Sequence, residues 1–230
     1  MPNIEENLAN VGARIRAAEN KFARRANSVQ LIAVSKTKPL SLVQQAIAAG
    51  QKVFGESYAQ EAIEKKNALK DEAIEWHFIG PIQSNKTRPL AENFDWIHSV
   101  DRLKIAQRLN EQRPKALGPI NILLQVNISE EETKAGVAMN ELQTLIESVL
   151  QMPSLKLRGL MAIPAKSIEP DEQRSAFHRM SLLLAELNEK YETSMDCLSM
   201  GMSNDLEAAV AEGATFVRIG TDIFGAREYK

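Results

Sequence analysis

Hydrophobic residues change their spacing along the chain near residue 30. Before that point, five apolar residues fall near helical spacing and predict an amphipathic helix: Ile4, Leu8, Val11, Ile15 and Phe22. After it, short apolar or β-branched runs alternate with segments of helical pattern. We expect strands in eight such runs, at 31–35, 52–56, 75–80, 95–100, 120–128, 155–163, 196–201 and 215–221.

Helical patterns separate these runs, at 40–50, 58–69, 85–94, 102–112, 139–152, 172–191 and 205–213. Strands that alternate with helices in this way are typical of an α/β protein with a parallel sheet. Eight of them predict a single (β/α)8 barrel of the TIM type, preceded by the extra N-terminal helix, and 230 residues suffice for one lean barrel. An open doubly wound sheet is the alternative. Because no linker or shift in composition is present, we expect one domain, 1–230.

Composition limits the classes of partner that the protein can bind and the cellular compartments in which it is expected. The chain has 28 basic and 30 acidic residues and a net charge of −2, so it has no excess of positive charge for nucleic acid. Cys197 is the single cysteine, which excludes an intrachain disulfide and fits a reducing compartment. The N-terminus lacks the apolar core of a signal peptide, and no run reaches the roughly 20 apolar residues of a membrane span. We therefore expect a cytoplasmic protein.

The stretch "LIAVSKTKP" ends an apolar strand on an amine. Ile32, Val34 and Lys36 share one face of that strand, and the active face of a (β/α)8 barrel lies where its strands end. Partial desolvation there favours a neutral, nucleophilic amine, which can form a Schiff base with a carbonyl compound. The alternative is a lysine that simply reaches solvent at the end of a strand.

Two loops near the C-terminus carry small and hydroxyl residues. In "SMGMSNDLEAAVAEG", Ser203 or Asn204 is expected to cap the following helix, with Glu207 completing a capping box. In "RIGTDIFG", Gly220 and Thr221 end the eighth strand. The loops after strands seven and eight are the usual phosphate site of this fold, so together they favour an anion over capping alone.

Arg218 adds a cation to the same end of the barrel. It alternates with Phe216 and Gly220 in a strand that should be buried, and a buried guanidinium needs an acceptor. That acceptor is either a ring nitrogen of a ligand or a carboxylate of the barrel. A Schiff-base lysine, a phosphate site and an arginine near a ring nitrogen together describe pyridoxal 5′-phosphate (PLP).

Six motifs resemble the YggS/PROSC family of PLP homeostasis proteins: "AVSKTKP", "FGESYAQE", "WHFIGPIQSNK", "LMAIP", "LSMGMSNDLEAA" and "VRIGTDIFGAR". They extend from about residue 31 to the C-terminus. The resemblance implies the barrel of the alanine racemase N-terminal domain, which is the type III fold of PLP proteins. It also implies that PLP is held as a Schiff base (aldimine) for the supply of the cofactor, without an established reaction.

Matched residue by residue, the resemblance implies six cofactor-binding positions: Lys36 (Schiff base), Met161, Ser203, Arg218, Gly220 and Thr221. In this assignment Arg218 faces the ring nitrogen, the two hydroxyl loops hold the phosphate, and Met161 lines the cofactor. The family's usual "FGENY" reads "FGESY" here, so Ser57 shortens any polar contact from that loop. Lys134 is either a second amine near the ligand or part of a solvated acidic loop.

Two classes of function remain open. The first is a PLP-binding protein that buffers the cofactor or delivers it to apo-enzymes. The second is a weak alanine-racemase-like or other PLP enzyme, and a class I aldolase is a more distant third. A racemase needs an acid or base on each face of the substrate carbon. Its two-domain relatives use a tyrosine from the partner's second domain, for which Tyr58 is the one candidate here. The lean barrel with an open mouth therefore favours the non-enzymatic class, and without a second domain we expect a monomer.

The histidines are expected to be structural. His77 and His98 lie in neighbouring predicted strands, where each is either hydrogen-bonded in the core or part of the polar lining of the mouth. His178 lies in a predicted helix. Three histidines without close cysteine or acidic partners make no metal signature.

Overall fold

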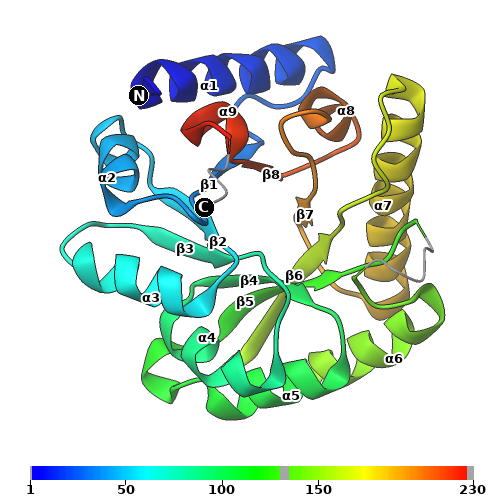
Figure 1. Ribbon diagram of the computed structural model, residues 1–230. Coiled ribbons are helices and arrows are strands. Elements are labelled where there is room, and N and C mark those ends of the chain that lie inside the picture. The colour runs from blue at the N-terminus through cyan, green and yellow to red at the C-terminus, as the bar shows by residue number, and fades with distance from the viewer. Residues whose placement is uncertain (1, 130–134, 227–230) are drawn as a thin grey trace.

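Eight parallel strands form a closed barrel in the computed structural model, which describes residues 2–129 and 135–226 (Figure 1). Each strand pairs with the next in sequence, and β8 pairs with β1, which rules out the open sheet. The strands are β1 (Gln30–Val34), β2 (Val53–Glu56), β3 (Glu75–Phe78), β4 (Trp96–Val100), β5 (Ile120–Gln125), β6 (Leu155–Met161), β7 (Cys197–Ser199) and β8 (Phe216–Ile219).

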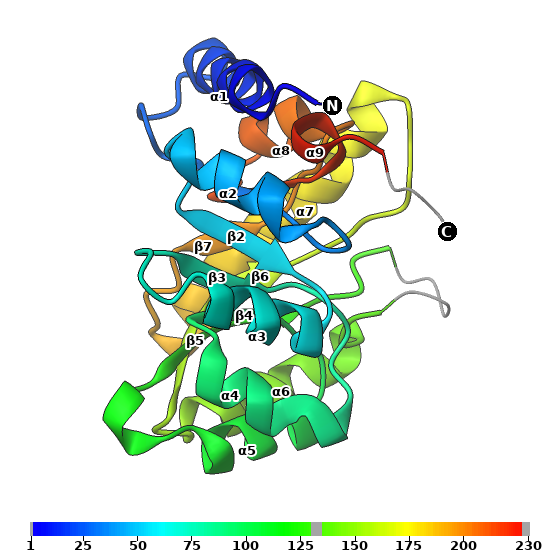
Figure 2. The same cartoon turned by 60° about the vertical axis from the view of Figure 1, so that its left-hand side comes forward.

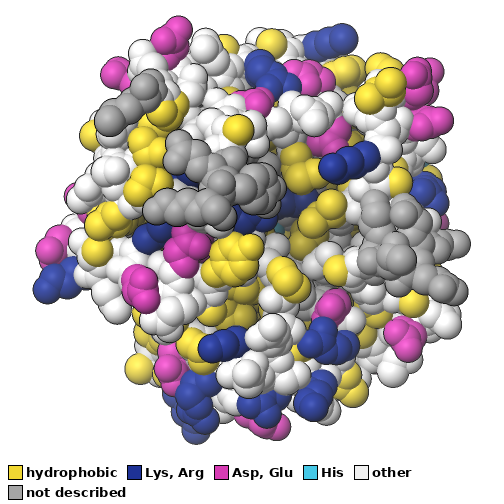
Figure 3. All heavy atoms as spheres, in the orientation of Figure 1, with side chains coloured by type: hydrophobic (Ala, Val, Ile, Leu, Met, Phe, Trp, Pro, Cys, Tyr) yellow, Lys and Arg dark blue, Asp and Glu magenta, His cyan; other side chains and the backbone are white. Residues whose placement is uncertain are grey.

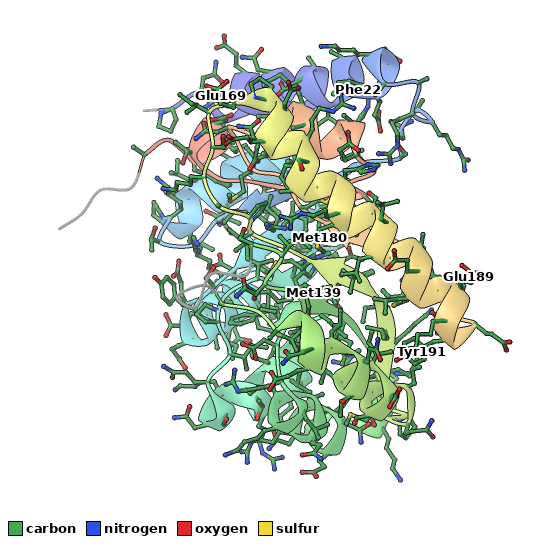
Figure 4. All side chains as sticks on the ribbon, turned by 90° about the vertical axis from the view of Figure 1, so that its right-hand side faces the viewer. Phe22, Met139, Glu169, Met180, Glu189 and Tyr191 are labelled. Carbon is green, nitrogen blue, oxygen red and sulfur yellow. The ribbon has the colours of Figure 1, made fainter. Side chains whose placement is uncertain are left out.

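Helices cover the outside of the barrel. They are α1 (Ile4–Lys21), α2 (Leu40–Ala48), α3 (Ala59–Ala68), α4 (Thr87–Asn93), α5 (Leu103–Gln112), α6 (Met139–Leu150), α7 (Pro170–Tyr191), α8 (Leu206–Ala211) and α9 (Thr221–Phe224), with short 3-10 turns at η1 (Ser84–Lys86) and η2 (Lys115–Leu117). In Figure 4, α7 crosses one side of the barrel from Glu169 to Tyr191, and Met180 in its middle is fully buried.

The strands are apolar because both of their faces are buried. Alternate side chains point outward, where they meet the apolar sides of the helices, or inward. The inward set forms a separate buried cluster within the barrel: Ile32, Val53, Trp96, Leu123, Met161, Cys197 and Phe216. Seven of the eight strands each contribute one residue to this cluster, whereas β3 turns a histidine inward, as described below.

The N-terminal helix compensates for a short final helix. The helix after β8, α9, has only four residues, and α1 packs against both α8 and α9 at that side of the barrel (Figures 1 and 2). Ile4, Val11 and Ile15 of α1 are buried in this contact. Asn7 Nδ2 also donates a hydrogen bond of 2.8 Å to the carbonyl of Ile223 in α9. The extra helix is therefore part of the barrel wall.

All eight predicted strands and all seven predicted inter-strand helices are present, as is the N-terminal helix. One prediction at the C-terminal end was wrong. The eighth strand ends at Ile219, and Thr221 begins α9 instead of ending the strand. Among the described residues, no helix is long and apolar enough to cross a membrane.

Candidate functional site

The ends of the strands meet at one face of the barrel, which we call the mouth. Figure 1 looks onto this face, and the space-filling view in the same orientation shows hydrophobic side chains gathered around its middle, with basic side chains between them (Figure 3). Active sites of this fold occupy this face because the loops after all eight strands converge there. Every residue that the sequence assigned to cofactor binding, except Met161 and Arg218, lies within the four residues that follow a strand.

Lys36 lies two residues beyond the end of β1 and is half-buried. Ile32 of the same strand belongs to the inner cluster, so alternation places Val34 on the inner face, and Lys36 follows just beyond the end of the strand. β1 pairs with β8 in the register Ile32 to Arg218. An added Cβ at Gly220 would lie 3.2 Å from the carbonyl oxygen of Val34. The loop that starts at Gly220 therefore lies beside the segment that carries Lys36.

A buried ion pair supports the Lys36 segment from behind, which the sequence did not predict. Lys65 Nζ of α3 contacts Glu56 Oε1 at 2.8 Å and the carbonyl oxygen of Ser35 at 2.7 Å. Ser35 Oγ donates to the same carboxylate at 2.7 Å. Burial raises the pKa of Glu56, and the charge of Lys65 opposes that effect. Glu61 accepts from the backbone amide of Thr37 at 2.7 Å, so both neighbours of Lys36 are held.

The loop after β7 differs from its predicted capping pattern. The N-cap residue of α8 is Asp205, neither Ser203 nor Asn204, and no side chain caps the helix, so the predicted capping box with Glu207 is absent. Asp205 instead accepts a hydrogen bond of 2.5 Å from the amide of Met202 and closes a local turn. Its carboxylate thus competes with the predicted cap. Within the described residues, the hydroxyl groups of Ser203 and Thr221 make no hydrogen bond.

Arg14 of α1 ties the two loops together. Its Nη2 donates to the carbonyl oxygen of Ser203 at 2.9 Å, and its Nη1 contacts Asp222 of α9 at 2.8 Å. Its Nε contacts Glu207 of α8 at 2.9 Å. One guanidinium thus bridges the loop after β7 and the helix after β8. Sequence reasoning missed Arg14 because it lies 189 residues from Ser203 and 208 residues from Asp222.

Arg218 points into the barrel and is 4% exposed. Its Nη1 donates to Ser199 Oγ at 2.7 Å, and its Nη2 donates to the carbonyl oxygen of Ala162 at 3.0 Å. Both acceptors are neutral, so the observed bonds are not those of an ion pair with a barrel carboxylate. Burial lowers the pKa of Arg218 to about 10, while the charge of Asp205 raises it, and the side chain stays cationic at neutral pH.

His77 and His98 are fully buried in the barrel interior and bond to each other at 2.8 Å between Nδ1 and Nε2. This confirms the structural, hydrogen-bonded alternative and not the polar lining of the mouth. Among residues 2–129 and 135–226, no group of histidine, cysteine or acidic side chains could hold a metal ion.

The remaining predicted residues occupy varied environments. Met161 is fully buried at the end of β6, where it joins the inner cluster. Ser57 follows β2 and is 9% exposed, packed so closely that an added Cβ at Gly80 would overlap its backbone. Tyr58 begins α3 and is 54% exposed. Lys134 lies outside the described residues.

Known proteins with similar sequences cover the whole chain. The family model described as alanine racemase, N-terminal domain, matches residues 7–228. The pyridoxal phosphate homeostasis protein of Pseudomonas aeruginosa is 58% identical over 229 residues, which are 100% of this chain and 98% of that protein. The protein of the same name from Escherichia coli is 50% identical over 232 residues, which are 100% of this chain and 99% of that protein.

Solved structures agree. PipY of Synechococcus elongatus, in a structure with PLP bound, is 38% identical, has a TM-score of 0.85, and matches over 97% of this chain and 100% of PipY. An alanine racemase from Corynebacterium glutamicum is 19% identical and shares the fold alone, with a TM-score of 0.67 over 95% of this chain and 61% of the racemase. These matches confirm the resemblance that the sequence motifs indicate. The chain belongs to the family of pyridoxal phosphate homeostasis proteins, within the wider family of the alanine racemase N-terminal domain.

Proposed function

We propose that this chain binds PLP at the mouth of the barrel, attaches it covalently to Lys36, and serves the homeostasis of that cofactor. One observation carries the proposal: Lys36, Arg218 and the loop at Gly220 converge from the neighbouring strands β1 and β8. Lys36 offers an amine for the aldehyde of a phosphorylated pyridine, Arg218 offers a buried hydrogen-bond donor for its ring nitrogen, and the loop at Gly220 offers backbone amides for its phosphate. The names of the relatives and the PLP in PipY support the same cofactor.

The residues present fit the cofactor. Gly220 allows a close approach, since an added Cβ would lie only 3.2 Å from the carbonyl oxygen of Val34. The amides of Ile223 and Phe224 donate to Gly220, whereas the first two amides of α9 have no acceptor within the helix and suit a phosphate, which the hydroxyls of Ser203 and Thr221 can also approach. Within the described residues, three of the five N–H groups of Arg218 are not engaged and suit a ring nitrogen. Bound PLP would supply an aldehyde carbon and an electron-withdrawing ring.

The chain's own residues favour storage over turnover. Arg218 donates hydrogen bonds but stays protonated, so it would leave the ring nitrogen without a proton and weaken the ring as an electron sink. Racemisation also needs paired acid and base groups, and Tyr58 is the tyrosine near the mouth among the described residues. Tyr191 lies at the far end of α7, where it contacts Glu147. We propose that the protein holds PLP and releases it to apo-enzymes, and is not an enzyme.

Two assays separate these functions. The purified protein should show a visible absorption band that borohydride bleaches, which identifies the covalently held cofactor. Incubated with L-alanine, it should form almost no D-alanine or pyridoxamine phosphate, yet it should reactivate an apo-transaminase. Steady multiple turnover would favour the racemase-like alternative. Failure to reactivate, under conditions where free PLP reactivates fully, would remove the support for delivery.

Loss of either loop hydroxyl should weaken PLP binding. A hydrogen bond to a charged group contributes roughly 1.5–3 kcal/mol, so Ser203→Ala and Thr221→Val should each raise the Kd for PLP about tenfold or more. Pyridoxal, which lacks the phosphate, should bind wild type poorly and should not distinguish the variants. Equilibrium titration followed by absorption measures both ligands. Equal affinities of wild type for PLP and pyridoxal would remove the phosphate assignment.

Arg14→Ala should weaken PLP binding without touching the ligand. It removes the bridge between the carbonyl of Ser203 and Asp222, so the two loops lose their fixed separation. Because Arg14 is 35% exposed, solvent screening limits the effect to about fivefold in Kd. Arg25→Ala, at an exposed arginine beyond the same helix, is the matched control. Equal Kd values for both variants would contradict a bridging function.

Further properties belong to the same proposal. We propose that residues 1–230 act as one domain, that the protein is a monomer, and that it is cytoplasmic. The single, buried and unbridged Cys197 supports the last point. Sedimentation of the purified protein tests the monomer.

A further inference from the structure

A line of hydrogen-bonded side chains crosses the barrel interior. Glu75 Oε1 lies 2.7 Å from His77 Nε2, and His77 Nδ1 lies 2.8 Å from His98 Nε2. His98 Nδ1 lies 2.8 Å from Ser199 Oγ, which lies 2.7 Å from Arg218 Nη1. We call these five residues the relay. It begins at the first residue of β3, at the face opposite the mouth, and ends at Arg218 near the close of β8.

The ionised end of the relay fixes the direction of its hydrogen bonds. An ionised Glu75 can only accept, so His77 carries its proton on Nε2 and donates it to that carboxylate. A neutral His77 then accepts at Nδ1, so His98 donates from Nε2 and accepts at Nδ1. Ser199 Oγ gives its hydrogen to His98 Nδ1 and accepts from Arg218, which can only donate. Glu75 and two neutral imidazoles thus require the Nε2–H tautomer of both rings, and the donor Arg218 is compatible with it.

Burial keeps both imidazoles neutral. Desolvation lowers the pKa of His98 well below its usual value, and the charge of Arg218 acts in the same direction. Desolvation also lowers the pKa of His77, although Glu75 and Asp95 oppose it. The hydrogen bond from His77 in turn lowers the pKa of Glu75, which is 41% exposed and stays ionised.

Aromatic rings and one further cation enclose the relay. Trp96 stacks on His77 with ring centroids 5.5 Å apart and an interplanar angle of 6°. The ring of Phe216 is tilted against that of His98, and their centroids are also 5.5 Å apart. Arg158 of β6 lies over Trp96, and its charge also lowers the pKa of Glu75. All four imidazole nitrogens have a partner, so the network is complete in a region that excludes water.

The relay and one carbonyl anchor the guanidinium of Arg218. Ser199 Oγ accepts from one terminal nitrogen, and the carbonyl oxygen of Ala162 accepts from the other. Two acceptors on different nitrogens fix both the position and the plane of the group. The N–H groups that remain are therefore presented in one orientation.

We propose that Glu75, His77, His98 and Ser199 are positioning residues that hold Arg218 as a fixed hydrogen-bond donor toward the ring nitrogen of the cofactor. This inference rests on the proposed function, because the ring nitrogen is that of PLP at the mouth. Through the relay, the hydrogen bond that Arg218 donates to the ring nitrogen depends on the charge of Glu75 at the opposite face of the barrel. A merely structural core network would fix the fold without reaching the ring.

The first measurement uses the protein without cofactor. In ¹⁵N NMR spectra, His77 and His98 are expected as neutral Nε2–H tautomers at about pH 7, and they should stay neutral well below the usual imidazole pKa of about 6.5. The chain has three histidines, and His178→Gln removes the third set of signals. A protonated ring, or an Nδ1–H tautomer in either residue, would overturn the relay whatever the protein binds.

The second measurement uses the protein loaded with PLP carrying ¹⁵N in its ring. In wild type the ring resonance should be that of an unprotonated nitrogen and should not move with pH. Ser199→Ala cuts the link to Arg218, so the resonance should become pH-dependent and the Kd for PLP should rise about three- to tenfold. Ser199→Thr keeps the hydroxyl and should restore the wild-type spectrum. A wild-type resonance in Ser199→Ala would overturn the proposal.

A variant at the exposed end avoids the risk of misfolding in the core. Glu75→Gln keeps an acceptor oxygen but removes the charge, so the resonances of His77, His98 and the labelled ring should all shift. Glu72→Gln removes one charge from the exposed turn before β3, outside the relay, and is the matched control. Equal ring spectra for the two variants would overturn transmission along the relay. If the wild-type protein binds no PLP, the proposed function and the proposed contact between Arg218 and the ring nitrogen are both contradicted. The histidine spectra, which need no cofactor, still test the hydrogen-bond directions of the relay.

Discussion

Lys36→Ala is expected to abolish covalent attachment of PLP and to leave the barrel folded. The amine is the group that attaches to the aldehyde, and alanine offers no substitute. Lys36 contributes little to the core, since it is half-buried at a strand end and its neighbours are held by Lys65 and Glu61. PLP should still bind without a covalent bond, through its phosphate and ring. Borohydride reduction followed by mass measurement gives the covalent stoichiometry, and circular dichroism reports the fold.

The neighbouring lysine provides the matched control. Lys38 belongs to the same segment, but its Nζ donates to the carbonyl oxygens of Gly225 and Ala226 at 2.9 and 2.7 Å. Lys38→Ala should therefore retain full covalent stoichiometry. Lys134→Ala tests the second amine considered from the sequence. If borohydride still fixes PLP to Lys36→Ala at the wild-type stoichiometry, then Lys36 is not the attachment site.

The barrel could be predicted from the sequence because its pattern is local. Each strand is a short apolar run, and each helix has an apolar side that recurs every three to four residues. Closure of the sheet follows from the number of strands and their alternation with helices, and the pairing of β1 with β8 confirms it. By contrast, the segment Thr221–Phe224 is too short to show helical periodicity, so α9 was not predicted.

The sequence indicated which residues could form the site more reliably than it indicated which contacts those residues make. Arg218 was placed on the inner face from alternation alone, and its burial agrees. The inward direction of Lys36 stays a prediction. The cap of α8 was predicted wrongly, because Ser203, Asn204 and Asp205 are all good N-cap residues and only the three-dimensional turn selects Asp205.

Contacts between distant segments were out of reach. Arg14 reaches loops near the other end of the chain, and Ser199 carries no signal that would single it out among serines. His77 and His98 were recognised as hydrogen-bonded core residues, but their register across β3 and β4 decides that they bond to each other. A tautomer chain from Glu75 to Arg218 depends on four strands at once, so no single stretch of sequence contains it.

The anchors of Arg218 depend on a close approach of β6 to β7. Gly159 of β6 has φ +150°, a conformation that other residues rarely adopt, and its pairing partner is Cys197. An added Cβ would overlap the carbonyl oxygen of Cys197 and lie 2.9 Å from its carbonyl carbon. These atoms are backbone, so they can give way only if the two strands separate. Ser199 lies two residues beyond Cys197 on β7, so a separation of the two strands would also displace this residue of the relay.

Gly159→Ala is therefore expected to lower the free energy of unfolding by more than about 4 kcal/mol, a large share of the roughly 5–15 kcal/mol typical of a domain. Urea titration measures the loss, and any folded fraction should bind PLP more weakly because β6 and β7 carry both anchors of Arg218. Two glycines at which an added Cβ would have no atom within 4 Å serve as comparison sites for this loss of stability. Gly12→Ala in α1 should stabilise by about 0.5–1 kcal/mol. Gly118→Ala, at φ +65° and ψ −178°, should cost about 1–3 kcal/mol from its backbone conformation alone. A loss at Gly159 no greater than that at Gly118 would mean that the approach of β6 to β7 does not limit stability.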